Sequence, residues 1–328
     1  MLEPLLIIFI AIALLYGFLT GIQTSANVVA SAIASRAMSP RIALTISALA
    51  NFIGPFLFGV AVAETIGTEV VSEEAVTVPT ALAALLAAIF WNFLTWWFGI
   101  PSSSSHAFIG GFVGSAVMGY GINAVQLPGL IRVLLALFIS PFLGFGFAYL
   151  LMVFFLWVGR YLSPSVNQFF LRSQWITMIS LGLSHGTNNA QKVMGILTFG
   201  LVAYGILPEF VVTDWVIFIS AGVVALGTAL GGWRVIRTIG AGFYRIRAVH
   251  AFSSQISSSV VILGAALLGG PVSTTHVISS SIVGAGSAER VNMIRWGLAT
   301  QISMAWLVTI PVNFILGAIF YYLLAAIL

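Results

Sequence analysis

Long apolar stretches alternate with short polar turns along the whole chain. About 20 apolar residues form a helix that crosses the hydrocarbon core of a bilayer, so each stretch predicts a membrane helix. Two stretches contain a polar patch near their middle, and two are short and follow a neighbour after one tight turn. The pattern predicts an all-α integral membrane protein with about 10–12 membrane segments. The stretches are 5–35, 42–63, 80–99, 105–121, 127–158, 173–201, 213–231, 249–269, 271–286 and 293–328.

The composition supports a location inside a membrane. Of the 328 residues, 12 are Lys or Arg and 8 are Asp or Glu, so 6% are charged, while 60% are hydrophobic. Ordinary soluble domains have roughly 25% charged residues, and this chain lacks the polar groups to cover a soluble surface. The composition therefore excludes a nucleic-acid binder and leaves the lipid bilayer as the surroundings. The absence of Cys excludes disulfides and Cys-ligated metal ions.

Arginines mark one side of the predicted membrane. Ten of the 11 arginines fall in one set of loops, with Glu289 as the only acid among them, whereas Arg132 lies in the other set. Because basic loops face the cytoplasm, the distribution predicts a plasma-membrane protein with both termini outside. The ten arginines are Arg36, Arg41, Arg160, Arg172, Arg234, Arg237, Arg245, Arg247, Arg290 and Arg295, and the acids of the opposite loops are Glu3, Glu64, Glu69, Glu73, Glu74, Glu209 and Asp214.

Two polar motifs occur twice. The segments PSSSSH at 101–106 and PVSTTH at 271–276 each precede a helix, at an offset of 170 residues. The polar patches GIQTSAN at 21–27 and GTNNAQK at 186–192 are separated by 165 residues. We therefore predict one membrane domain made of two inverted repeats, residues 1–160 and 161–328. Each repeat is expected to contain a helix broken at its polar patch and one helical hairpin, at 80–121 and 249–286. Each hairpin either crosses the membrane twice or is re-entrant.

Inverted repeats with interrupted helices in matching positions are typical of secondary transporters that bind substrate at mid-membrane. A run of hydroxyl residues at a helix start offers hydroxyls and free N–H groups to an oxyanion. The simpler alternative is helix capping, which needs only one such residue. The predicted substrate contacts are Thr24, Ser25, Asn27, Ser103, Ser104, Ser105, Asn188, Asn189, Ser273, Thr274 and Thr275.

The segment SHGTNNAQK at 184–192 resembles the G-x-N-D signature of the inorganic phosphate transporter (PiT) family, and 271–276 is similar to that family's hairpin tip. The resemblance covers both halves and implies sodium- or proton-coupled uptake of inorganic phosphate. The chain departs from the family at each signature Asp, where Thr24 and Asn189 stand. The alternative role for the polar patches is hydrogen bonding between helices. The candidate ligands of a coupling ion are Gln23, Thr24, Asn27, Asn188, Asn189 and Gln191.

Lys192 is the single lysine and the only formal charge deep inside a predicted helix. Since no acid lies at membrane depth, a bound anion is one candidate partner, and snorkelling of the amine to the interface is the alternative. His106, His185 and His276 flank the predicted site. They are candidates for proton transfer or for neutral hydrogen bonding within the hairpins. No spacing of ligands indicates zinc.

These observations predict a cation-coupled phosphate symporter that is not an enzyme and has no cofactor, with sodium or protons as the coupling ion. Sulfate or another tetrahedral oxyanion is the alternative substrate. Hydrogen phosphate donates a proton that a carboxylate accepts, whereas sulfate has none, and both carboxylates are missing here. A serine hydrolase does not need Ser and His in two inverted copies, and an anion channel would not accumulate substrate. The sequence leaves the oligomeric state open, a homodimer included.

Overall fold

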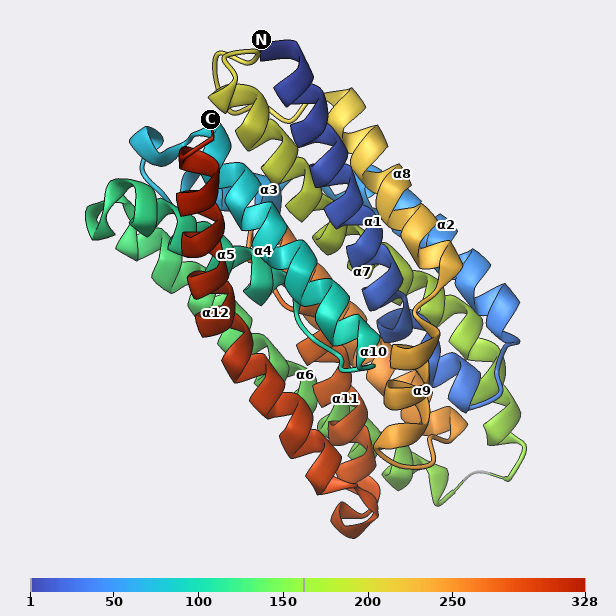
Figure 1. Ribbon diagram of the computed structural model, residues 1–328. Coiled ribbons are helices and arrows are strands. Elements are labelled where there is room, and N and C mark those ends of the chain that lie inside the picture. Colours follow the sequence, from blue (N-terminus) through green and yellow to red (C-terminus); the bar gives the residue numbers. More distant parts are fainter. Residues whose placement is uncertain (1, 162, 328) are drawn as a thin grey trace.

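The computed structural model describes residues 2–161 and 163–327, and these residues are almost entirely helical (Figure 1). Three short 3-10 turns join some of the helices. The helices are α1 Leu2–Ala34, α2 Pro40–Phe58, α3 Ala61–Thr68, α4 Val78–Trp97, α5 Ser104–Tyr120, α6 Leu127–Gly159, α7 Val166–Ala203, α8 Asp214–Leu230, α9 Trp233–Gly242, α10 Ala248–Leu267, α11 Thr274–Glu289 and α12 Trp296–Ala325.

The same order of elements occurs twice. A long helix (α1, α7) is followed by a helix with a short continuation (α2–α3, α8–α9), a hairpin (α4–α5, α10–α11) and a second long helix (α6, α12). Both chain ends lie at one end of the molecule, and α9 lies toward the other (Figure 1). This arrangement confirms the predicted class, an all-α membrane fold of two inverted repeats with two hairpins.

The helix breaks lie outside the polar patches where the sequence predicted them. α1 and α7 are continuous through 21–27 and 186–192. The breaks follow the next helix of each repeat, at Gly59 between α2 and α3 and at Gly231 between α8 and α9, where the chain bends by 68°. Both glycines have a positive φ, which glycine adopts without the steric cost of a Cβ. Backbone conformation therefore determines the breaks, and side-chain polarity does not.

In the polar patches, hydroxyl groups bond to carbonyls of the preceding turn, and the side chains face protein. Thr24 donates to the carbonyl of Thr20 at 2.7 Å, and Thr187 donates to that of Leu183 at 2.8 Å. All side chains of 23–27 and 186–192 are buried. Because these side chains are buried, neighbouring helices supply their hydrogen-bond partners, and the helix need not unwind to expose its backbone.

Glycines let the helices of the two repeats approach closely. A Cβ on Gly21 of α1 would lie 2.3 Å from the carbonyl oxygen of Val224 in α8, and one on Gly186 of α7 would lie 2.3 Å from that of Asn51 in α2. The first residue of each polar patch is thus a backbone contact between α1 and α8 or between α7 and α2. Such crossings depend on small residues, as membrane helix packing generally does.

The last helix of each repeat packs on the hairpin of the other. A Cβ on Gly114 of α5 would lie 2.0 Å from the carbonyl oxygen of Phe314 in α12, and one on Gly284 of α11 would lie 2.3 Å from that of Phe145 in α6. Because α6 contacts α11 and α12 contacts α5, the two halves interlock.

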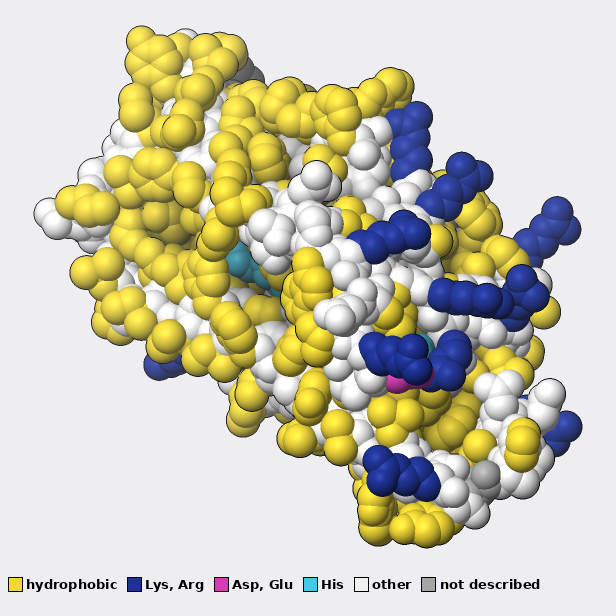
Figure 2. Space-filling view, turned by 90° about the horizontal axis from the view of Figure 1, so that it is seen from below, with side chains coloured by type: hydrophobic (Ala, Val, Ile, Leu, Met, Phe, Trp, Pro, Cys, Tyr) yellow, Lys and Arg dark blue, Asp and Glu magenta, His cyan; other side chains and the backbone are white. Residues whose placement is uncertain are grey.

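Within the part of the chain that the structure describes, six helices are long and apolar enough to cross a membrane, or seven if the bent pair α8–α9 counts as one span. The surface carries exposed Phe, Leu and Ile side chains over most of its area, and basic side chains gather toward one side of the face seen from below (Figure 2). A broad apolar belt with charge restricted to its ends is the surface of a membrane protein.

Candidate functional site

The tips of the two hairpins meet inside the protein. Ser105, at the start of α5, donates a hydrogen bond to the carbonyl of Val272 in the other tip at 3.2 Å. The rings of His106 and His276, one turn into α5 and α11, lie 4.4 Å apart between centroids. Every predicted site residue is at most 3% exposed. The two motifs, 170 residues apart in sequence, therefore form one buried cluster.

One serine in each tip caps its helix. Ser103 accepts a hydrogen bond from the backbone N–H of His106 at 3.2 Å, and Ser273 accepts one from that of His276 at 3.3 Å. The Nδ1 atom of His106 also lies 2.7 Å from the Ser103 hydroxyl. The capping alternative therefore describes Ser103 and Ser273, and it leaves Ser104, Ser105, Thr274 and Thr275 outside that role.

α1 and α7 add amides and a cation to the second tip. Asn27 donates to the hydroxyl of Thr275 at 3.0 Å, and Asn189 donates to that of Thr274 at 3.5 Å. Lys192 donates to the carbonyl of Val272 at 3.1 Å and to the side-chain oxygen of Asn189 at 2.9 Å. The polar patches of both long helices thus converge on the tip at 272–275.

Two predicted site residues face the helix breaks. Gln191 donates to the carbonyl of Gly59 at 2.5 Å and accepts from the N–H of Val62 at 2.7 Å, so it joins the free ends of α2 and α3. Ser25 accepts from the N–H of Gly232 at 2.7 Å, at the start of α9. These contacts satisfy backbone groups that a broken helix would otherwise leave unpaired inside the protein.

Several buried polar atoms around the tips have no partner among the described residues. Asn188 uses neither atom of its side-chain amide. The free amide atoms comprise three acceptors and one donor, and each free histidine nitrogen donates or accepts according to its tautomer, so the cluster offers hydrogen bonds of both kinds to a small polar ligand. They are Oε1 of Gln23, Oδ1 of Asn27, Nδ2 and Oδ1 of Asn188, and Nε2 of His106 and of His276.

The electrostatics of the cluster depend on Lys192. The ion pairs among the side chains that the structure describes, at 4–161 and 163–327, are Arg132–Glu69, Arg247–Glu289 and His250–Glu289. Lys192 has only neutral acceptors in the described chain, and it is 2% exposed. It does not reach an interface, so the snorkelling alternative is wrong. A buried cation with neutral ligands favours an anion beside it.

Three residues that the motif analysis missed hold the cluster in place. Tyr16 donates to the carbonyl of Ser104 at 3.3 Å, and the Thr95 hydroxyl accepts from Gln23 at 3.0 Å. The Oδ1 atom of Asn51 lies 2.8 Å from Nδ1 of His185. Asn51 and Thr95 are isolated polar residues in apolar helices. That is a weak signal in sequence, and only the fold shows what they contact.

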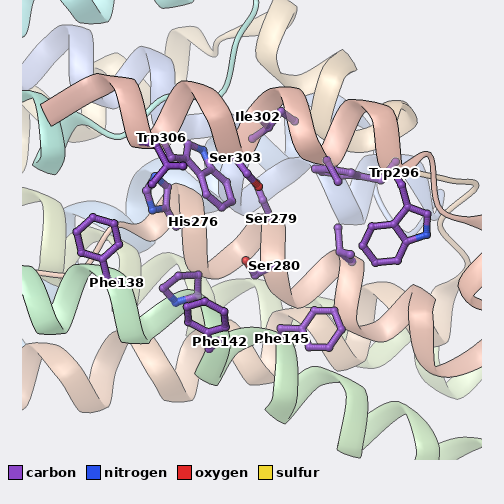
Figure 3. Close-up of a pocket in the computed structure, with 15 residues that line it drawn as sticks. Phe138, Phe142, Phe145, His276, Ser279, Ser280, Trp296, Ile302, Ser303 and Trp306 are labelled. Carbon is purple, nitrogen blue, oxygen red and sulfur yellow. The ribbon is translucent and has the colours of Figure 1, made fainter. Parts of the chain in front are cut away.

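A cavity of about 400 Å³ opens beside the second tip, between α6, α11 and α12 (Figure 3). The ring of His276 stacks on Trp306 at 3.9 Å between centroids, with Ser279 and Ser303 next to this pair. Phe138, Phe142 and Phe145 of α6 line the opposite wall. The cavity is mostly apolar, so it extends the lipid-facing surface toward His276.

Amide and hydroxyl oxygens are the groups here that suit a cation. Among the described side chains, no group of three or more His, Asp or Glu is arranged to hold a metal ion. The free oxygens of Gln23, Asn27 and Asn188 are hard ligands of the kind that hard cations prefer.

The fold and the buried cluster define a membrane transport protein built from inverted repeats, with its polar centre where two hairpin tips meet. The chain belongs to the phosphate transporter family, whose profile matches residues 20–317. This confirms the expected family and a transport function in place of catalysis.

Relatives and a solved structure cover nearly the whole chain. It is 40% identical to a probable low-affinity inorganic phosphate transporter of Rhizobium meliloti over 97% of this chain and 96% of the relative. It is 39% identical to a protein of the same description from Bacillus subtilis, over 98% and 97%. A solved structure described as the sodium-dependent phosphate transporter matches with a TM-score of 0.89 at 24% identity, over 99% of this chain and 100% of that one. At that identity the match concerns the fold.

Proposed function

We propose that the protein is a cation-coupled symporter of inorganic phosphate that binds its substrate between the two hairpin tips. The main support is the buried convergence of both tips with the free amide of Asn188 and with Lys192, a cation without an acidic partner. A phosphate ion needs many donors and a few acceptors, and this cluster supplies both. The relatives described as phosphate transporters support the choice of substrate.

In this proposal the donors have separate tasks. The hydroxyls of Ser104, Ser105, Thr274 and Thr275 and the first N–H groups of α5 and α11 hold the anion's oxygens. Lys192 supplies the compensating charge that a buried anion requires. The free Oδ1 atoms of Asn27 and Asn188 accept a hydrogen bond from the P–O–H group of hydrogen phosphate.

The proposal also includes a coupling ion. A multiply charged anion at mid-membrane is costly without compensating cations. Two Asp residues at the signature positions would add to the negative charge that cations must compensate, whereas Thr24 and Asn189 are neutral and Lys192 is basic. We therefore expect this protein to bind fewer sodium ions than a relative that carries both Asp, or to use protons.

The double variant Thr24→Asp with Asn189→Asp tests the coupling. Asn189 lies 2.9 Å from the Lys192 amine, so an Asp there would pair with the lysine and leave the substrate's charge uncompensated. Sodium activation of uptake at fixed pH should become steeper in this variant. Thr24→Ser, which keeps the hydroxyl, should behave as the wild type. Multi-ion sodium activation in the wild type, unchanged by the double variant, would show that the missing carboxylates do not set the coupling.

Sulfate is the second candidate substrate, and the neutral residues at positions 24 and 189 favour it. A fully ionised sulfate is not repelled by Thr or Asn, whereas two carboxylates would repel it. Uptake of labelled phosphate and labelled sulfate into proteoliposomes, with imposed sodium or proton gradients, separates the two. Accumulation of sulfate alone would replace the proposed substrate, and flux without accumulation would indicate a channel.

The proposed orientation places the arginine-rich end in the cytoplasm and both termini outside the plasma membrane. Support comes from the distribution of the ten arginines and from the position of both chain ends at the opposite end of the molecule (Figure 1). We further propose that the repeats comprise residues 1–160 and 161–328, since the order of helices restarts at α7.

A further inference from the structure

Two open cavities occupy corresponding positions at opposite ends of the molecule. One, of about 660 Å³, lies among the end of α1, α9 and the residue before α12, and we call it the arginine cavity. The other, of about 610 Å³, lies among the end of α7, α3 and the residue before α6, and we call it the glutamate cavity. In the repeated order of helices, α1 corresponds to α7, α9 to α3 and α12 to α6. The two cavities are therefore counterparts.

The counterparts differ in charge. The glutamate cavity is lined by Glu73 and Glu209 and by no basic residue. The arginine cavity is lined by five basic side chains and no acid; these are Arg36, Arg237, Arg245, Arg247 and Arg295. The positive-inside rule accounts for arginines in these loops, but it does not require that loops from three parts of the chain direct them at one hollow.

Little in the described chain neutralises this charge. Arg247 pairs with Glu289, whose carboxylate His250 also contacts at 2.7 Å. The other four arginines form no ion pair among residues 4–161 and 163–327, whose side chains the structure describes. Four unpaired guanidinium groups around one cavity repel one another, and an anion between them would relieve that repulsion.

One of these guanidinium groups, that of Arg36, belongs to a residue with a strained backbone. It has a φ of 61°, the only positive φ of a non-glycine residue in the described chain. The N–H of Arg36 bonds to the carbonyl of Ile33 and that of Ala37 to Ala32, the pattern of a helix end at which glycine is the usual residue. An arginine there is strained, and its side chain lines the cavity.

We infer that the arginine cavity is a second anion site, separate from the buried cluster, which takes the phosphate group of a soluble phosphate ion or of an anionic lipid headgroup. Guanidinium groups bind phosphate oxygens in pairs through parallel hydrogen bonds, and arginine is preferred where that geometry matters. The cavity is open, and its arginines are exposed, so an anion reaches it without opening the hairpins. Binding here requires no transport, so the inference goes beyond the proposed symport.

Equilibrium binding of labelled inorganic phosphate tests the site, with the purified full-length protein in sodium-free phosphatidylcholine nanodiscs. The wild type should show a class of sites that weakens as salt is added. The double variant Arg237→Gln with Arg245→Gln should lose at least about tenfold in the affinity of this class, because charge-assisted hydrogen bonds are removed. Arg41→Gln with Arg160→Gln, which removes the same charge from the same end outside the cavity, should match the wild type.

A second variant separates binding from folding. Arg36→Gly should raise the thermal unfolding midpoint, because glycine relieves the strained backbone, while it lowers phosphate affinity. A change in opposite directions cannot come from partial unfolding. Asn188→Ala, in the buried cluster, should leave the salt-sensitive class intact, so a failure of the buried site and a failure of this site are distinguishable.

Nanodiscs that contain phosphatidylglycerol identify the source of the phosphate group. If the lipid is the occupant, phosphatidylglycerol will displace labelled phosphate from the wild type and will be enriched in its co-purified lipid, but not in that of the Arg237→Gln, Arg245→Gln variant. If free phosphate is the occupant, the lipid will have no effect. Equal phosphate binding and equal lipid enrichment in the wild type and the double variant would overturn the site.

Discussion

Asn188 and Gln191 lie within one turn of α7, and both are amides that are fully buried, yet they differ in use. Gln191 bonds on both sides of its amide to the ends of α2 and α3, whereas Asn188 has no partner at either atom in the described chain. A satisfied buried amide stabilises the fold, and an unsatisfied one costs about 1–3 kcal/mol. Gln191 therefore has a structural role, and Asn188 is available to a ligand.

Two alanine variants should separate these roles. Asn188→Ala is expected to leave the free energy of unfolding unchanged or raised, because it removes an unpaired buried amide, and to weaken substrate binding. Gln191→Ala should lower the free energy of unfolding by about 1–3 kcal/mol, since the Val62 N–H and the Gly59 carbonyl lose their partner. Thermal unfolding and uptake kinetics measure both. Normal transport affinity in Asn188→Ala would mean that its free amide does not contact substrate.

Sequence reasoning grouped these residues but could not assign their roles. The polar patches and hairpin tips were visible as repeated motifs, and the fold brings them together. Whether an amide faces a tip or a helix break depends on where the neighbouring helix bends, and that bend occurs more than a hundred residues away along the chain. No local pattern at 186–192 contains this information.

At the scale of the helices, glycine positions determine where helices break and cross, and side-chain polarity does not. The breaks occur at Gly59 and Gly231, both with positive φ, while the polar stretches that looked like interruptions are continuous helix. The glycine that opens each polar patch instead sets a helix crossing. Gly21 contacts α8 and Gly186 contacts α2 at distances that leave no room for a Cβ.

Alanine at these crossings should be costly. In Gly21→Ala or Gly186→Ala the new Cβ would lie 2.3 Å from a carbonyl oxygen, so the helices must separate. We expect the free energy of unfolding to fall by about 1–3 kcal/mol, the usual range for overpacking. Gly264→Ala in α10 is the control, because its Cβ meets nothing within 4 Å; helix propensity there favours alanine by roughly 0.5–1 kcal/mol. Equal effects at the three positions would remove close packing as the cause.

At the scale of the whole molecule, the chain separates charge by end. The arginine cavity and the glutamate cavity are counterparts in the repeated fold and have opposite signs. The sequence predicted the two-sided charge distribution because arginine counts in loops need no tertiary information. It did not predict the cavities, which form only when helices distant in sequence come together.

Cysteine labelling of this Cys-free chain checks which end faces the cytoplasm. Ser165→Cys lies at the arginine-rich end and Asn123→Cys at the other, and both positions are exposed. In intact cells an impermeant maleimide should label Asn123→Cys and should label Ser165→Cys only after lysis. Labelling of Ser165→Cys from outside would reverse the orientation and exchange the sides of the two cavities.

The interlocking of α6 with α11 and of α12 with α5 has a consequence for biosynthesis. A ribosome releases α5 long before α12 exists, so the glycine face of α5 that Phe314 eventually covers must wait in lipid while nearly two thirds of the chain is still to be made. The 30 residues of α12 emerge last and complete a contact begun in the first third of the chain. A nascent chain arrested before Trp296 would therefore have a first hairpin that is inserted but unclamped, and it would be a target for membrane quality control.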